Sequence, residues 1–128
     1  MQAPKIPLNE AQRLQALHEL NILDTEAEER FDRLTRLAKL YFQVPTVLIS
    51  LIDANRQWFK SRQGLDACET PREISFCGHA ILQRDVFFIP DATQDSRFAD
   101  NPLVVGAPYI VSYAGTPLLL NNGYCVGT

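Results

Sequence analysis

The N-terminal third of the chain carries the apolar spacing of amphipathic helices. Leu14, Leu17 and Leu20 recur every three residues and predict a helix over residues 9–20. A second helix is expected to follow the capping-box pair Thr25 and Glu28 and to end just before a proline. Its expected buried face consists of apolar residues at helical spacing, namely Phe31, Leu34, Ala38, Tyr41 and Phe42.

The pattern then changes to that of strands. Residues 46–52 are rich in β-branched residues and apolar on both alternating faces except at Ser50, so they predict a central strand covered on both sides. Residues 110–120 predict a long strand, and Asn122-Gly123 predicts a hairpin turn into another strand. The chain therefore reads as two helices followed by a mixed region of strands and short helices.

Residues 69–81, which read ETPREISFCGHAI, hold most of the side chains that could carry chemistry. Ser75 is expected to cap a short helix with Phe76, Cys77 and His79. Because positions two apart on a helix point in different directions, Cys77 and His79 predict no metal site. Two alternatives stay open for each: Cys77 is a small buried hydrophobe or a reactive thiol, and His79 contacts a ligand or a nearby backbone carbonyl.

Three more polar side chains are candidates for a binding pocket. Ser50 is the only polar residue on one face of the central strand, and Tyr113 is expected to lie over a pocket because its ring is amphipathic. Asp91 follows a proline at a strand end, where it either faces a pocket or caps the next turn through its carboxylate.

Composition narrows the possible functions. The 128 residues predict one domain, and a net charge of −3 lacks the basic footprint of a nucleic-acid-binding protein. The longest apolar stretch, residues 47–52, is too short to cross a bilayer, so no membrane contact is expected. Three widely spaced cysteines argue against a disulfide framework and for a reducing, cytoplasmic compartment.

Three segments taken in order resemble the GAF domain, and most closely the GAF domains at the N-terminus of bacterial sensor histidine kinases and diguanylate cyclases. They are DANRQWFKS at residues 53–61, ETPREISFCGHAI at residues 69–81 and IPDATQDSRFADNPLV at residues 89–104. The resemblance runs from about residue 9 to residue 128 and implies the α+β class with a GAF/PAS-like antiparallel sheet.

In this fold a helical segment at residues 9–43 would cover one face of the sheet. Residues 46–128 would form the sheet and the loops that roof a pocket on the other face. The resemblance also implies that residues 1–128 are a single GAF domain, truncated at its C-terminal strand and helix.

The function implied by the resemblance is non-catalytic sensing. The domain would bind a small-molecule ligand, form a homodimer and pass its signal to a kinase or GGDEF-type output domain. Neither ligand nor cofactor is identified by the sequence. Bilin attachment is not expected, because bilin-binding relatives carry adjacent Cys and His residues and Gly78 separates them here. The candidate ligand-binding residues are Ser50, Phe76, Cys77, His79, Asp91 and Tyr113.

Two alternatives accompany this interpretation. Free methionine-(R)-sulfoxide reductase is a GAF protein with three cysteines, and Cys68 and Cys77 stand nine residues apart in a similar loop. The position of that enzyme's third cysteine corresponds to residues 106–109, which contain none. The other alternative is a dimerisation module that binds no ligand.

Overall fold

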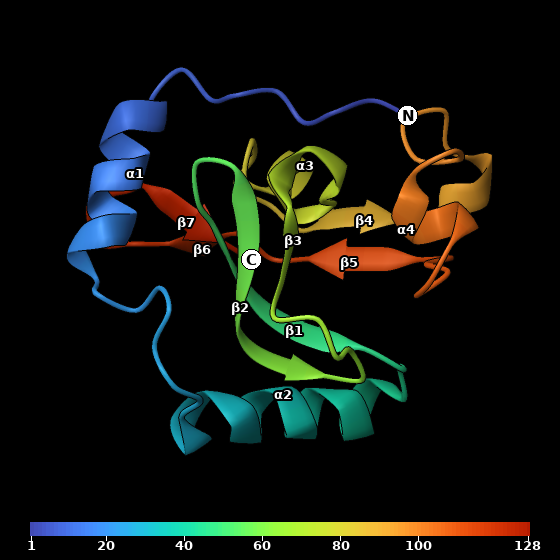
Figure 1. Cartoon of the computed structure of the whole chain (residues 1–128), viewed down its shortest axis with the longest axis horizontal. Helices are drawn as coiled ribbons and strands as arrows, with labels where there is room; N and C mark the ends of the chain where they lie inside the picture. Colours follow the sequence, from blue (N-terminus) through green and yellow to red (C-terminus); the bar gives the residue numbers. More distant parts are fainter.

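The computed structural model describes all 128 residues. The chain folds into a sheet with helices on both sides (Figure 1). The main sheet has five antiparallel strands in the order β3-β2-β1-β7-β6, and β4 and β5 form a separate antiparallel pair. The strands are β1 (Val47–Ile52), β2 (Arg56–Gln63), β3 (Glu69–Pro71), β4 (Phe87–Ile89), β5 (Tyr113–Gly115), β6 (Leu118–Leu119) and β7 (Cys125–Gly127). The helices are α1 (Glu10–Glu19), α2 (Glu29–Phe42), α3 (Cys77–Ala80) and α4 (Pro102–Val105), with 3-10 turns η1 (Arg72–Ile74) and η2 (Ala92–Gln94).

The two N-terminal helices cover one face of the main sheet, as the sequence predicts. Leu17 of α1 packs against Leu51, Trp58 and Val126. The next residue along β1, Ile52, points to the opposite face, where it packs with α3 and β7. Alternation along one strand therefore separates a helical layer from a layer of short helices and loops.

A second apolar core lies between α3, the β4–β5 pair and α4. Its centre is a stack of Phe76 on Phe98, whose ring centroids are 4.2 Å apart. The other buried members are Ala80, Phe87, Ile89, Ala92 and Val104. This core holds the loops over the sheet face that the N-terminal helices leave free.

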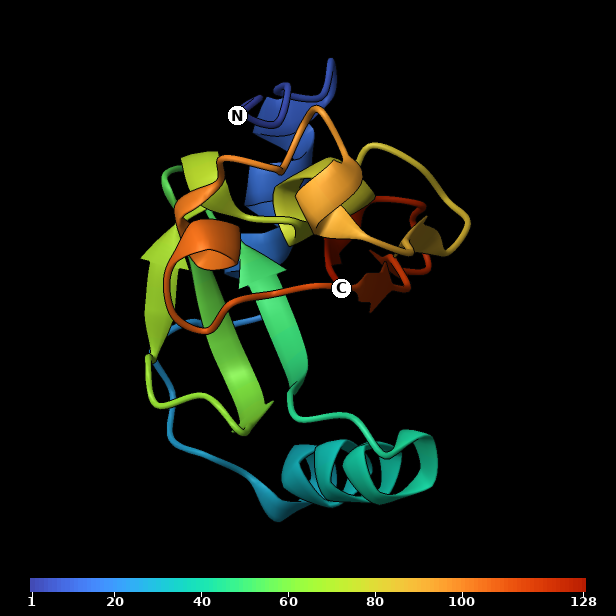
Figure 2. The ribbon, with the colours of Figure 1, turned by 90° about the vertical axis from the view of Figure 1, so that its right-hand side faces the viewer.

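Helix α2 lies across one end of β1 and β2, while α3, α4 and the β4–β5 pair gather towards the other end (Figure 2). The prediction of which face of α2 is buried is wrong. Thr35 is the only buried residue of α2, and its hydroxyl lies 2.8 Å from the Ser61 hydroxyl on β2. Because this end of the sheet offers polar partners, the helix turns a polar side inward. Phe31 and Ala38 are half-buried, whereas five other apolar residues are exposed: Leu34, Leu37, Leu40, Tyr41 and Phe42.

The expected capping box at the start of α2 is also absent. Glu28 occupies the N-cap position without a side-chain hydrogen bond. Its carboxylate instead forms an ion pair with buried Lys60 at 2.8 Å, and the Thr25 hydroxyl accepts a hydrogen bond from the same ammonium. A buried ammonium needs polar partners, so Glu28 and Thr25 both bind Lys60 and neither side chain caps the helix.

The strand expected over residues 110–120 is two strands. Pro117 separates β5, which pairs with β4, from β6, which pairs with β7. The missing N–H of proline explains the break, because a strand cannot donate to a neighbour at that position.

The Asn122-Gly123 hairpin forms as predicted, with Gly123 at φ +87°. The strand after it, β7, pairs on its other side with β1 at Leu51 and Gly127. A side chain at Gly127 would place its Cβ 1.9 Å from the Ser50 carbonyl oxygen, so the close approach of the two strands requires glycine. None of the helices has the length and apolar character needed to cross a membrane.

Candidate functional site

Four of the six candidate ligand-binding residues meet on the sheet face away from α1 and α2. The Tyr113 hydroxyl donates to the Cys77 sulfur at 3.1 Å and lies 3.4 Å from the Thr128 hydroxyl. The Ser50 hydroxyl donates to the Thr128 carbonyl at 3.2 Å. Phe76 completes the group, with its ring centroid 5.3 Å from that of Tyr113.

This cluster is packed rather than open. Ser50, Phe76 and Cys77 are buried, and the Ser50 hydroxyl and the Cys77 sulfur already have hydrogen-bond partners within the protein. Burial raises the pKa of Tyr113 well above its ordinary value of 10.0, and the neighbouring Cys77 raises it further. The phenol therefore stays protonated and acts as a hydrogen-bond donor over the whole neutral range.

His79 lies outside the cluster and faces the N-terminal segment. Its Nε2 is 3.0 Å from the Gln2 carbonyl oxygen, and its ring meets that of Phe98 edge-on at 4.9 Å. Burial lowers the pKa of His79, and the hydrogen bond to Gln2 opposes that shift only in part. Of the two alternatives, this geometry matches the bond to a backbone carbonyl.

Asp91 also lies apart from the cluster, because it is exposed and caps η2. Its Oδ1 accepts from the Thr93 backbone N–H at 3.0 Å. The nearby pair of Asp95 and Arg97 fixes the next turn, and Arg97 holds the pKa of Asp95 at about 2. These carboxylates therefore organise loop structure.

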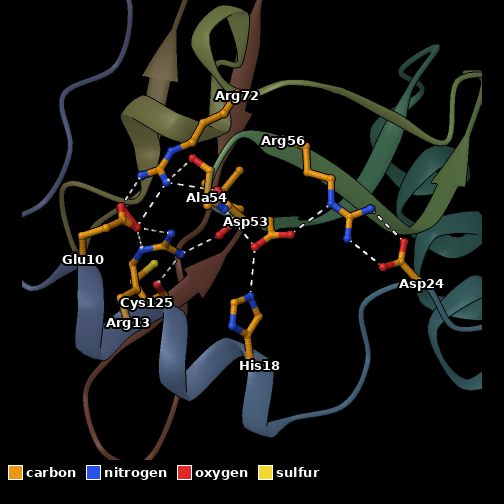
Figure 3. A network of polar contacts seen from close by, with 10 residues as sticks. Glu10, Arg13, His18, Asp24, Asp53, Ala54, Arg56, Arg72 and Cys125 are labelled. Atoms are coloured by element: carbon orange, nitrogen blue, oxygen red, sulfur yellow. Dashed lines mark hydrogen bonds and ion pairs between the residues drawn. The ribbon is translucent and has the colours of Figure 1, made fainter.

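A buried ionic network that the sequence did not reveal joins α1 to η1 (Figure 3). Glu10 accepts from Arg13 Nε at 2.9 Å and from Arg72 Nη2 at 2.8 Å. Arg13 also donates to the Ile52 carbonyl at 2.7 Å, and Arg72 to the Asp53 carbonyl at 3.0 Å. One carboxylate thus serves two guanidinium groups that are almost completely buried.

Burial alone would raise the pKa of Glu10, but hydrogen bonds from Arg72 and Arg13 outweigh it, so this pKa lies below its ordinary value of 4.5. Burial lowers the pKa of Arg13, and Glu10 offsets part of that effect. One sequence signal could have located Arg13, which stands four residues before Leu17 on the buried stripe of α1.

A second ionic group anchors the other end of α1 (Figure 3). Asp53, at the β1–β2 turn, accepts from Arg56 Nε at 3.0 Å and lies 3.0 Å from His18 Nε2. Arg56 also binds both carboxylate oxygens of Asp24 at 2.7 Å. Together the two groups fix α1 and the loop after it against the β1–β2 hairpin.

All three cysteines are free thiols in different surroundings. Cys68 is exposed and accepts from Arg62 Nη1 at 2.9 Å, whereas Cys77 and Cys125 are buried. No three His, Cys, Asp or Glu side chains converge in a way that could hold a metal ion.

The sheet order, the N-terminal helices on one face and the α3 layer on the other agree with a comparison to known families, in which residues 26–128 match the GAF domain. The chain belongs to the GAF domain family. It is also 44% identical over all of its 128 residues to the cyclic di-GMP phosphodiesterase PA2567 of Pseudomonas aeruginosa. The chain spans only 22% of that protein's length.

Solved structures of low identity share the fold. A GAF domain of A. aeolicus nlh2 in an inactive state superposes with a TM-score of 0.60 at 15% identity, covering 96% of this chain and 78% of that one. A type II free methionine-R-sulfoxide reductase from Thermoplasma acidophilum gives a TM-score of 0.61 at 15% identity, covering 87% and 72%. The reductase is thus a relative in fold, and the family match supports a regulatory domain that is not itself an enzyme.

Proposed function

We propose that this GAF domain is the sensory module of a longer protein of cyclic di-GMP signalling, in which it binds a small ligand and regulates an output domain. The supporting observation is the 44% identity over the whole chain to a part of a cyclic di-GMP phosphodiesterase. In this proposal the sensor works in the cytoplasm, because its three free thiols suit a reducing compartment. The output domain is a phosphodiesterase or GGDEF-type cyclase in preference to a kinase.

The experiment compares cyclic di-GMP turnover by the longer protein with turnover by the same protein lacking residues 1–128. A sensory module changes the activity of the output domain, so we expect rates that differ several-fold. Equal rates would contradict regulation by this domain, and absence of both synthesis and hydrolysis would contradict the cyclic di-GMP pathway.

One structural observation favours dimerisation as part of this function. Leu37, Leu40 and Tyr41 project from α2 with exposed fractions of 64%, 77% and 78%. Apolar side chains gathered on one helix face are typical of a contact with another protein surface. The same face would serve the alternative function, a dimerisation module without a ligand.

Sedimentation analysis of the chain and of its Leu37→Glu variant tests this part of the proposal. We expect a dimer for the original chain and a monomer for the variant, because a carboxylate in an apolar contact must be desolvated. Gln12→Glu, which adds the same single negative charge at an exposed position of α1, is the control for charge. A monomeric original chain would contradict the homodimer.

A further inference from the structure

A surface groove of about 570 Å³ lies between the N-terminal segment, the end of α3 and the β6–β7 hairpin. Figure 1 shows the N-terminal segment running from α1 past α3 towards α4. Gln2 fixes that segment through a 2.9 Å hydrogen bond from its backbone N–H to the Arg97 carbonyl. The volume is that of a small-molecule site, and the groove lies at the opposite end of α3 from the cluster of Cys77 and Tyr113.

The charged side chains that line the groove are all cationic: Lys5, Arg13 and Arg84. Arg13 is paired with Glu10, but Lys5 and Arg84 form no ion pair. Arg84 makes one hydrogen bond, to the Gly123 carbonyl at 3.3 Å, and so keeps further N–H donors free. On a chain of net charge −3, two unpaired cations beside one groove are a local reversal of sign.

The buried network at the inner end of the groove adds to this positive potential. Glu10 is the single carboxylate that pairs with both Arg13 and Arg72, so the three groups together carry one positive charge. Low-dielectric surroundings screen that charge less than water does. The buried network and the two unpaired cations, Lys5 and Arg84, therefore both favour the binding of an anion in the groove.

Apolar side chains form the rest of the groove. Ile81 and Cys125 are buried at its floor, whereas Ile6 and Leu82 at its walls are 59% and 42% exposed. Exposed aliphatic residues that gather around one concavity indicate a ligand with an apolar part. Charge and apolar surface together define an amphipathic ligand.

We propose that this groove binds a small organic anion, with a carboxylate or phosphate head between Lys5 and Arg84 and an aliphatic body against Ile81 and Leu82. This inference names the ligand class of the sensor proposed above and rests on that function. The guanidinium of Arg84 and the ammonium of Lys5 can each form charge-assisted hydrogen bonds to either head group.

The first test titrates the 128-residue chain with octanoate, octyl phosphate and uncharged octanol, and follows backbone amide shifts by NMR. We expect one or both anions to shift residues around Ile81 and Cys125 and octanol to bind at least about tenfold more weakly. Binding of one anion alone identifies its head group as the one recognised. If neither anion binds below about 10 mM, or if the shifts centre on α2, the proposal is wrong.

The matched variants are Lys5→Gln/Arg84→Gln and the control Arg33→Gln/Lys39→Gln. Both remove two positive charges, but the control pair lies on α2, away from the groove. We expect the first to weaken anion binding at least about tenfold and the control to leave it within about twofold. Equal effects would show general electrostatic attraction and overturn the site.

The apolar part is tested by chain length. We expect octanoate to bind the original chain more tightly than butanoate, and Leu82→Ser to reduce that difference because it removes apolar contact at the wall. Leu82 is 42% exposed, so the change should not unfold the domain. An unchanged preference would contradict the placement of the aliphatic body.

These measurements separate the site from the function. They use the domain alone, so a failure to bind rejects the groove and leaves regulation by the domain standing. If the anion binds but does not alter cyclic di-GMP turnover by the longer protein, the site stands and its sensory role is contradicted.

Discussion

At the scale of single residues, the molecule depends on how it neutralises buried charge. Arg13 and Arg72 are 1% and 4% exposed, and Glu10 is the only carboxylate that both can reach. Backbone carbonyls accept most of the remaining guanidinium N–H groups, and Arg72 Nε is left without a partner. Glu10 therefore carries more of the stability than its place at the start of a helix suggests.

We expect Glu10→Gln to lower the free energy of unfolding at pH 7 by about 3–5 kcal/mol, because it leaves two buried cations without a counterion. Urea denaturation followed by circular dichroism measures this loss. Glu19→Gln, an exposed change on the same helix, should cost about 0.5 kcal/mol or less. Similar losses for both variants would contradict the role given to the network.

The same carboxylate predicts part of the acid response. Because the folded pKa of Glu10 lies below 4.5, its stabilisation is present above that pH and is lost as the pH falls through the lowered value. In Glu10→Gln this component is missing, so stability should fall less steeply below pH 4.5 than in the original chain. If the stability of both proteins falls equally steeply below pH 4.5, other carboxylates cause the loss of stability in acid.

Tyr113 predicts the alkaline response. Its pKa is raised by burial, so its contribution to stability is complete below pH 10.0 and is lost as the pH rises further towards the folded pKa. Burial raises the pKa of Cys125 as well, which adds to the loss above pH 9.0. Tyr113→Phe should lower the free energy of unfolding by about 1 kcal/mol at pH 7 and make stability fall less steeply with rising pH in the alkaline range. Tyr109→Phe, at a phenol that is 65% exposed, should do neither.

At the scale of elements, the two N-terminal helices share a face of the sheet but are attached differently. Helix α1 contributes Leu17 to an apolar core and is tied at both ends by ionic groups. Helix α2 contacts β2 through the hydroxyls of Thr35 and Ser61 and keeps its large apolar residues outside. The sheet therefore stabilises α1 strongly and leaves α2 with a surface for another contact.

Two leucine substitutions at helical sites should differ accordingly. Leu17→Ala should lower the free energy of unfolding by about 2–5 kcal/mol, because Leu17 is 0% exposed and its removal leaves a cavity. Leu37→Ala, at a side chain that is 64% exposed, should change the stability of the monomer by about 0.5 kcal/mol or less. Thermal or urea unfolding at low protein concentration decides this. A large loss for Leu37→Ala would mean that α2 packs by its apolar side.

At the scale of the whole molecule, the sheet is incompletely paired at its centre. Strand β1 pairs with β2 along its full length, but with β7 only around Ser50 and Leu51. Residues 47–49 thus lack a strand on that side, and their free backbone groups are available to a further segment. We propose, as the family resemblance implies, that in the longer protein the next residues extend β7 along this edge and then form a helix.

A longer form of the chain that includes this strand and helix should therefore melt several degrees higher than residues 1–128. Each backbone hydrogen bond adds about 0.5–1.5 kcal/mol, and a stabilisation of about 1 kcal/mol moves the melting temperature of such a domain by a few degrees. Differential scanning calorimetry of both forms provides the measurement. Equal melting temperatures would contradict the extension of β7 along β1.

The sequence alone determined the features that depend on near neighbours. Strict alternation placed Ser50 on the same face of its strand as Ile52, and the turn chemistry of Asn122-Gly123 fixed the β6–β7 hairpin. Periodicity predicted the helices and strands, because helical and strand periods are local properties of the chain, whereas the GAF fold was indicated by the resemblance of three segments to that family.

Tertiary structure alone decided which partners distant residues find. Glu10 and Arg72 are 62 positions apart, and no local pattern states that one carboxylate will serve two arginines. The same holds for α2. Its apolar stripe predicted a buried apolar face, but in the structure the helix contacts β2 through Thr35 and Ser61 and its apolar residues are exposed. Periodicity shows that a helix has an apolar side, but only the surface it meets determines whether that side is buried.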